Sequence, residues 1–450
     1  MSLFTSWQPV RQHILALIIL VCTPGLTACT PGPEYVPPET MADRLDKFHN
    51  ATARDVLHEN SEMGHWWTDI GDPAINQDIS DLLQDNLDLK QAAARIKQAE
   101  EQVKINAGPL APMLSVSANR NRNFRPAEEF GNIFGGAGGN LGGGTTRVFD
   151  TSIETSATAS WQIDLFGRIR NQVEAAEARS AATRLDREAL IHTLISEVVQ
   201  RRVSLTALNH QLQLARSIEK NRSRLLSFVE RRYERGSAGV TLADLHLARQ
   251  RLAGVRGDII EIEQSMKEEA YAMDILLGKA PGTLSPVLEQ ARLTPPPFDV
   301  PVKVPARLLD RRPDLRSAEL RLIAQNKDIG VAIADLYPDL SITGNIGFED
   351  ETTNDLFRSE RLLGSFITDL TMTLFQGGAL RARIRLQDAR KEELIAAYAQ
   401  DVLNAVKDVE TALMQEQKIN KRLRRIKTEM TAARARAQTE KRRYENGVIA

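Results

Sequence analysis

Apolar residues recur at steps of three and four along two long stretches of the chain, 168–235 and 379–446. Neither stretch contains a glycine or a proline. This pattern predicts two amphipathic helices, each roughly 100 Å long, that pack on other helices rather than on lipid. The repeating apolar positions include Leu205, Leu208, Leu212, Ala215 and Ile218 in the first stretch, and Ile395, Tyr398, Val402, Val406, Val409 and Leu413 in the second.

Four shorter segments are rich in serine, threonine and β-branched residues and predict strands: 113–124, 148–164, 340–348 and 365–374. In the second segment, apolar side chains around Ile153 alternate with polar ones, which gives one face for lipid and one for water. No stretch of the predicted mature chain is apolar enough for a membrane helix, so a membrane crossing would need these strands. Four strands cannot close a water-filled barrel, and therefore we expect other copies of the chain to complete it.

The chain contains two copies of one plan. The motif at 88–92 recurs at 314–318 and the motif at 112–116 recurs at 338–342, with the same offset for both. Leu165-Phe166 recurs as Leu374-Phe375 at a smaller offset, so the first copy has additional residues between these motifs. They fall in a glycine-rich segment, 131–144, which lacks the Gly-Lys-Ser/Thr ending of a phosphate-binding loop and is interpreted as a surface loop.

These patterns predict a mainly α protomer with a small β part, divided into a signal, two repeats and a linker. The predicted segments are the signal peptide 1–28, the first repeat 29–280, a proline-rich linker 281–305 and the second repeat 306–450. Within the first repeat we expect a strand pair over 113–164, a long helix over 168–235 and a returning helix over 241–277. Within the second we expect a strand pair over 340–374 and a long helix over 379–446.

The N-terminus has the features of a lipoprotein signal. Arg11 precedes a short apolar run, 14–22, which cannot span a bilayer as a helix. Leu26-Thr27-Ala28-Cys29 then matches a lipobox, which predicts cleavage before Cys29 and its acylation; the alternative is an ordinary cleaved signal with an unmodified cysteine. Thr30 is not the aspartate that retains lipoproteins at the inner membrane, so we expect the outer membrane.

Charge and chemistry exclude several classes of function. The chain has 58 basic and 59 acidic side chains, which leaves no positive field for nucleic acid. His192, His210 and His246 lie in helical stretches without metal-ligand spacing, and no nucleophile–base arrangement can be argued. We therefore predict no enzyme activity, no catalytic residue, no metal and no cofactor.

Several motifs spread over residues 26–450 occur in one order, among them Trp66-Trp67, the segment Asn86 to Leu89, and Arg311-Arg312-Pro313-Asp314-Leu315, in which Pro313 is expected to start a helix. Together they resemble the outer membrane factor family of TolC-like ducts. Asp164-Leu165-Phe166-Gly167-Arg168 and Leu374-Phe375-Gln376-Gly377-Gly378 look like the family's strand-to-helix turns, which glycine permits. Gly32-Pro33-Glu34-Tyr35 is similar to the lipoprotein branch that contains OprM and NodT.

The resemblance implies a homotrimer with a 12-strand barrel above a coiled-coil tunnel in the periplasm. It also implies a passive outer membrane channel that receives substrates from a periplasmic adaptor and an inner-membrane transporter, expected to be of the resistance-nodulation-division type. Outer membrane lipid is a further expected partner. The alternative function is a lipid-tethered periplasmic coiled-coil scaffold, which would need neither the alternating strands nor the glycine-rich loop.

The expected adaptor-docking tips lie at the ends of the two long helices. Arg232, Tyr233 and Gly236 in the first copy, and Arg443, Tyr444 and Gly447 in the second, resemble the family's Arg-Tyr-x-x-Gly tips. A glycine helix cap with a cationic last turn explains the same residues. Asp244 is the nearest match to an entrance-gate acid, although it lies two positions farther from the glycine than the family pattern has it, and a solvated helix-start aspartate explains it as well.

The second repeat ends soon after Gly447, without a counterpart of the returning helix 241–277. Part of the apolar stripe of the helix at 379–446 would then face water. Either the reading frame is truncated here or the protein has lost part of its tunnel wall. Because the exposed stripe is costly, we expect that the reading frame continues beyond Ala450 into a helix with an acidic residue near its start, and that the extended form gives the stable trimer.

Overall fold

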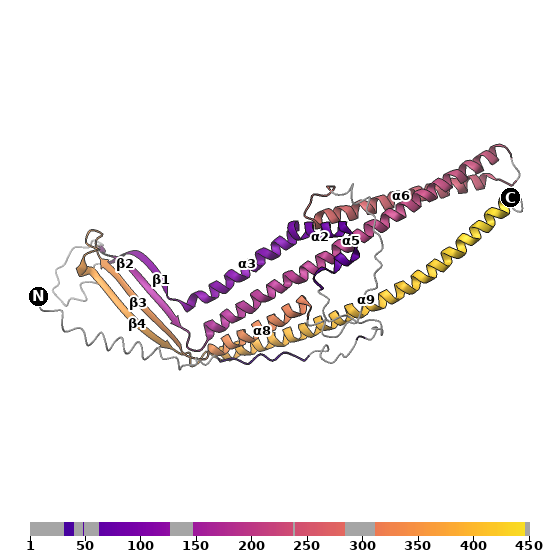
Figure 1. The fold of residues 1–450 in the computed structure, drawn as a ribbon. Helices are drawn as coiled ribbons and strands as arrows, with labels where there is room; N and C mark the ends of the chain where they lie inside the picture. Colours follow the sequence, from indigo (N-terminus) through magenta and orange to yellow (C-terminus); the bar gives the residue numbers. More distant parts are fainter. Residues whose placement is uncertain are drawn as a thin grey trace, which may run out of the picture. The chain divides into compact units, whose positions relative to one another are not determined.

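The computed structural model describes residues 31–39, 48, 63–126, 147–236, 239–283 and 311–445. It is mainly helical with one small sheet, which confirms the predicted fold class (Figure 1). In chain order the elements are η2 (Met63–Ile70), α2 (Pro73–Asp85), α3 (Leu87–Ala107), η3 (Gly108–Leu110), β1 (Met113–Pro126), β2 (Arg147–Ile163), α5 (Arg168–Glu234), α6 (Leu242–Leu276), α8 (Pro313–Ala334), β3 (Asp339–Asp350), η5 (Ser359–Arg361), β4 (Leu362–Thr371) and α9 (Ala379–Glu445).

Some predictions fall outside the described residues. They concern the signal peptide with Cys29, the glycine-rich segment at 131–144, residues 284–305 of the linker and Gly447. None of the helices that the structure describes contains a stretch with the length and apolarity of a membrane span.

The chain divides into two compact units, and each takes segments from both predicted repeats. The first comprises Met1–Pro37, Ala99–Ser180 and Leu320–Ile395, and the second comprises Pro38–Gln98, Ala181–Glu319 and Ala396–Ala450. The first unit therefore contains all four strands, whereas the α5–α6 hairpin end and α2 belong to the second. The repeats describe how the sequence is built, while each compact unit combines corresponding parts of the two copies.

The sheet of the first unit has the strand order β1-β2-β3-β4, and every neighbouring pair is antiparallel. Polar side chains join the strands: Asn345 Nδ2 donates to Thr158 Oγ1 at 3.1 Å, and the Ser117 and Ser156 hydroxyls lie 3.0 Å apart. Gly347 is required for the β2–β3 approach, because a Cβ there would lie 2.6 Å from the Thr155 carbonyl oxygen. Strands β1 and β4 are the outer strands.

The predicted end of the fourth strand is wrong. Strand β4 ends at Thr371, so Leu374 lies beyond it. The neighbouring strand explains the difference, because Thr371 pairs with Asp339, the first residue of β3. Residue 338 is a proline, which has no N–H to extend the ladder.

Both strand-to-helix turns use glycine in the left-handed region, as expected. The φ angle is 70° at Gly167 and 56° and 82° at Gly377 and Gly378. Before α5, the Asp164 carboxylate accepts hydrogen bonds from the backbone N–H of residues 169 and 170 at 3.1 and 3.0 Å. This carboxylate satisfies two of the N–H groups that a helix start leaves unpaired. Helix α8 begins at Pro313, as the sequence predicts.

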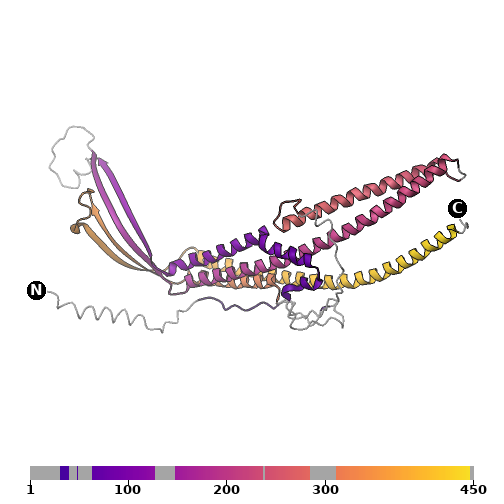
Figure 2. The same cartoon turned by 45° about the horizontal axis from the view of Figure 1, so that its top comes forward.

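The main hydrophobic core of the second unit lies where α2 and the start of α3 pack against α5 and the end of α6 (Figure 2). Fully burying one such aliphatic side chain contributes about 1.5–3 kcal/mol. The buried members are Trp67, Ile75, Ile79, Leu82, Leu89, Leu194, Ile195, Val198, Leu205, Ala270, Met273, Leu276 and Leu277.

A buried ion pair crosses this packing interface. Arg202 of α5 donates to the Asp78 carboxylate of α2 at 3.1 Å, and both residues are less than a tenth exposed. Burial raises the pKa of Asp78 to about 6, an effect larger than the opposing attraction of Arg202. Nearby Asp81 also raises the pKa, and Lys279, which is paired with Asp81, lowers it.

We predict that Asp78 makes the second unit less stable as the pH rises from about 4 to about 6.5. The folded-state pKa lies above the ordinary value of 3.8, so the folded protein binds the proton more tightly than the unfolded chain does. The stabilisation is complete below the unfolded pKa and is lost as the pH rises through the folded one. Relative to Asp78→Asn, the wild type should lose roughly 1–3 kcal/mol of unfolding free energy over this range.

The measurement is the unfolding of helical circular dichroism in detergent at each pH, compared between the two proteins. A stability difference that instead grows in favour of the wild type with rising pH would show that the attraction of Arg202 outweighs burial.

Candidate functional site

The candidate site is the turn between α5 and α6, at the end of a helical hairpin in the second unit (Figure 1). Helix α5 runs without interruption to Glu234, and Gly236 follows with φ 64°. The Gly236 N–H donates to the Tyr233 carbonyl at 2.9 Å. The predicted positive-φ glycine is therefore present, and it closes the last turn of α5.

Arg232 and Tyr233 lie in the last turn of α5. The Arg232 guanidinium carbon lies 5.6 Å from the centroid of the Phe228 ring, one turn earlier, and the Tyr233 side chain is 40% exposed. Phe228 is also 40% exposed. The last two turns of α5 thus carry a cation and two accessible aromatic rings, residue types that are enriched in protein interfaces. Phe228 was not among the predicted site residues, although its spacing of four positions from Arg232 is a usable signal.

Asp244 is part of a capping box at the start of α6. Its carboxylate accepts hydrogen bonds from the Thr241 hydroxyl at 2.6 Å and from the Thr241 N–H at 2.8 Å, while the Thr241 hydroxyl accepts from the Asp244 N–H at 3.3 Å. The Thr241 side chain and then its backbone lower the pKa of Asp244. In this chain Asp244 therefore caps a helix at the tip, and a gate role remains a prediction.

An apolar seam and flanking ion pairs hold the hairpin together. Leu212 and Ala215 of α5, and Leu245, Ala248 and Leu252 of α6, are buried. The ion pairs that join the two helices include Arg249 with Glu230 at 3.2 Å, Arg256 with Glu219 at 2.9 Å and Arg216 with Glu263 at 2.9 Å. Exposed pairs of this kind contribute little stability each, so the apolar seam supplies most of it. The pairs were not predicted, because they join residues 19 to 47 positions apart in the sequence.

The second predicted tip is only partly described. Arg443 forms an ion pair with Glu440 at 3.4 Å, one turn earlier in α9. Helix α9 ends at Glu445, and Gly447 lies outside the described residues. The observed tip geometry therefore comes from the first repeat.

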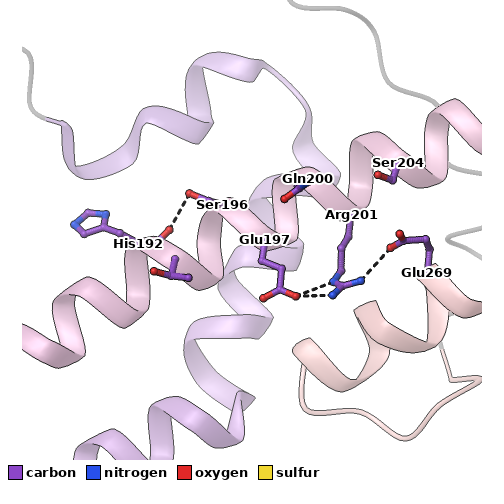
Figure 3. A pocket seen from close by; sticks show the side chains of 8 residues that line it. His192, Ser196, Glu197, Gln200, Arg201, Ser204 and Glu269 are labelled. Atoms are coloured by element: carbon purple, nitrogen blue, oxygen red, sulfur yellow. Dashed lines mark hydrogen bonds and ion pairs between the residues drawn. The ribbon is translucent and has the colours of Figure 1, made fainter. Parts of the chain in front are cut away.

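A polar hollow of about 720 Å³ lies farther along the hairpin (Figure 3). Arg201 of α5 donates to Glu197 at 2.5 Å and to Glu269 of α6 at 3.1 Å, which occupies both carboxylates. Burial lowers the pKa of Arg201, but its hydrogen bonds and ion pairs with the two glutamates outweigh that effect and raise it. His192 lies toward the other end of the hollow (Figure 3). Within the described part of the chain, no group of three histidine, cysteine or acidic side chains is placed to hold a metal ion.

Comparisons with known proteins match nearly the whole chain. The model of the family described as outer membrane efflux protein matches residues 79–279 and 304–450. The cation efflux system protein CusC of Escherichia coli O6:H1 is 26% identical over 434 residues, which cover 94% of this chain and 88% of CusC. The pyoverdine export outer membrane protein OpmQ of Pseudomonas putida is 30% identical over 391 residues, covering 85% and 79% of the two chains.

A solved structure of the outer-membrane channel OprN has a TM-score of 0.80 with this chain at 28% identity. The superposition covers 94% of this chain and 91% of OprN. The chain thus has the fold of a known outer-membrane channel.

We predict that Gly236→Val loosens the hairpin tip through backbone strain alone. A Cβ at Gly236 meets no atom within 4 Å, so the cost comes from its φ of +64°. A side chain in this left-handed region costs about 1–2 kcal/mol. Amide hydrogen exchange in the last turns of α5 should therefore become faster.

Gly254→Val is the matched control, because Gly254 lies inside α6, has equal free space and has no positive φ. Equal exchange rates at the end of α5 in the two variants would contradict the glycine-cap explanation.

Proposed function

This chain belongs to the outer membrane efflux protein family, and we propose that three copies of it form the duct of a tripartite efflux system. The protein is an efflux channel of the cell outer membrane with a TolC-like fold. The observation that best supports a multimeric duct is one four-stranded antiparallel sheet, with two outer strands, on the same chain as two 67-residue helices.

The apolar surface of the described residues supports assembly from several copies. The β4 residues are exposed, including Leu363 at 55% and Leu370 at 66%. On β1, Leu114 and Val116 are exposed to a similar extent. In lipid, the backbone groups of outer strands need partners, and the β4 edge of one copy can pair with the β1 edge of the next. Three such sheets would close the 12-strand barrel.

Helix α9 presents a second apolar surface. Ile419, Leu423, Ile426 and Met430 lie on one helical face at steps of four, three and four, and each is at least 40% exposed. A stripe with this spacing is typical of helices that pack in coiled coils. We propose that this stripe is covered in the wall of a periplasmic tunnel.

We propose that Cys29 carries the lipid that anchors the protein to the outer membrane. The segment after it is held against the first unit: Asn326 of α8 donates to the Pro33 carbonyl at 2.6 Å, and Lys391 of α9 donates to Asn326 at 2.7 Å. Gly32 lies so close to α8 that a Cβ there would be 3.2 Å from the Gly330 Cα. These contacts favour an anchored segment with a fixed path.

We propose that the periplasmic adaptor docks at the tips of the long helices. At the first tip, Arg232, Tyr233 and Gly236 form the contact surface, and Asp244 contributes charge near the entrance. Arg443, Tyr444 and Gly447 would form the second. An inner-membrane transporter of the resistance-nodulation-division type would supply the substrate, and the duct would conduct it passively, without enzyme activity or a cofactor.

The names of the relatives bear on the substrate. CusC is named for cation efflux and OpmQ for pyoverdine export, yet both resemble this chain to a similar degree. We propose that the transporter selects the substrate and that the duct accepts what it receives. A coiled-coil scaffold, the alternative from the sequence, has no need of the four-stranded sheet.

We predict that radiolabelled palmitate enters the wild-type protein and is absent from Cys29→Ser. Cys22→Ser is the control and should keep the label, because Cys22 is expected to leave with the signal peptide. With a cleavable signal retained, Cys29→Ser should still form trimers, since strands and helices hold them together. Label that persists in Cys29→Ser would refute the lipoprotein assignment.

We predict that the double variant Arg232→Ala/Tyr233→Ala weakens adaptor binding roughly tenfold or more, because arginine and tyrosine side chains dominate the binding energy of many interfaces. Efflux in a strain that depends on this channel should fall, while trimers remain in the outer membrane. Arg224→Ala is the control, an exposed arginine two turns before the tip on α5. If both variants bind the adaptor like the wild type, docking is elsewhere.

A further inference from the structure

A cavity of about 570 Å³ lies at the start of β1 in the first unit. Trp161 donates its indole N–H to the Leu110 carbonyl at 3.0 Å, which satisfies its polar atom and leaves its ring as apolar surface. The cavity is lined on one side by the turn between α3 and β1, Gly108, Pro109, Ala111, Pro112 and Met113, and on the other by Ser160, Trp161, Gln162 and Ser341.

Leu374 and Phe375 are the most exposed large apolar side chains that the structure describes, each at 88%. They follow the end of β4, the outer strand opposite β1, and precede the glycine turn into α9. Two adjacent apolar side chains exposed to this degree indicate a contact with another surface.

The first Leu-Phe pair of the chain shows how such a contact is made. Leu165 and Phe166 follow β2, and the Phe166 ring stacks on the Tyr337 ring with centroids 4.8 Å apart and an angle of 23°. Tyr337 lies in the turn before β3, the strand that pairs with β2. Only about 10 Å³ of space remains there, between the end of β2 and residues Ala334, Pro338 and Asp339.

The internal repeat predicts an equivalent contact at the outer strands. The alignment of 112–116 with 338–342 maps the turn before β3 onto the turn before β1, and Leu165-Phe166 corresponds to Leu374-Phe375. Tyr337 then corresponds to Ala111, so a methyl group stands where the other turn has an aromatic ring. The cavity beside Ala111 therefore lies at the position that corresponds to the Tyr337 ring of the second copy.

A single chain cannot make this contact, because β4 and β1 are at opposite edges of its sheet. We propose that Leu374 and Phe375 of one copy fill the cavity beside Ala111 of a second copy. This inference rests on the proposed multimeric duct and adds to it the residues that join neighbouring copies. The contact joins adjacent copies where the strands end and the helices begin.

The first test compares Phe375→Ala with Phe366→Ala, a control that removes an exposed phenylalanine from the middle of β4. Trimers extracted in mild detergent are followed by electrophoresis as they dissociate on heating. We expect Phe375→Ala to dissociate roughly tenfold faster than the wild type, because truncating an aromatic anchor mainly raises the dissociation rate. Phe366→Ala should remain close to the wild type.

A complementary variant tests the cavity itself. Ala111→Phe fills the cavity from its own chain and should also speed dissociation, because the neighbour's ring no longer fits. Combined with Phe375→Ala, it should restore much of the wild-type lifetime. Additive losses in the double variant would overturn the proposal, since independent sites add and contacting sites couple.

Cross-linking decides which copy supplies the ring. Ala111→Cys with Phe375→Cys should give disulfide-linked oligomers on oxidation, whereas Ala111→Cys with Phe366→Cys should not. Trimers that do not form this cross-link, together with a Phe375→Ala variant as long-lived as Phe366→Ala, would overturn the contact and leave the duct intact. A wild-type chain that forms no trimers, even in a form extended beyond Ala450, would overturn the duct and the contact together.

Discussion

The backbone groups along the two outer strands impose the constraint on which the rest of the assembly depends. Strands β1 and β4 each direct one row of N–H and C=O groups away from their own sheet. Water satisfies such groups at a soluble surface, but lipid does not, and each unpaired group costs several kcal/mol there. A chain of this family in the outer membrane therefore needs a neighbour at each edge, and the remaining features can be understood as ways of bringing neighbours together.

The long helices of the second unit also have apolar surface that needs a partner. Helices α5 and α6 bury apolar side chains against each other in a seam that has ion pairs at its margins. The two helices form a hairpin with its turn at Gly236. The stripe on α9 that begins near Ile419 has no comparable cover among the described residues. Its cover, like the partners of the strand edges, is expected from other helices of the assembly.

The core around α2 combines stability with an electrostatic cost. Aliphatic side chains from four helices meet there, and the Asp78–Arg202 pair lies buried between them. Burial of a charged pair is a weak source of stability, because desolvation offsets the attraction, as the raised pKa of Asp78 shows. Separating the partners would nevertheless be costly, because it would leave a charge buried alone.

The sequence by itself determined the elements with strong local signals. The stretches free of glycine and proline became α5 and α9, the alternating segments became strands, and Gly236 adopts the positive φ that its place after a helix requires. The repeat and the family motifs identified the class of protein, because both are properties of residue order. Tertiary structure alone decided what depends on residues distant in the chain. Strand β4 stops at Thr371 because its neighbour begins after a proline, Arg201 is paired with a glutamate 68 positions away, and Ala111 lines a cavity instead of filling it. Local patterns do not encode such facts, since each depends on which segments the fold places side by side.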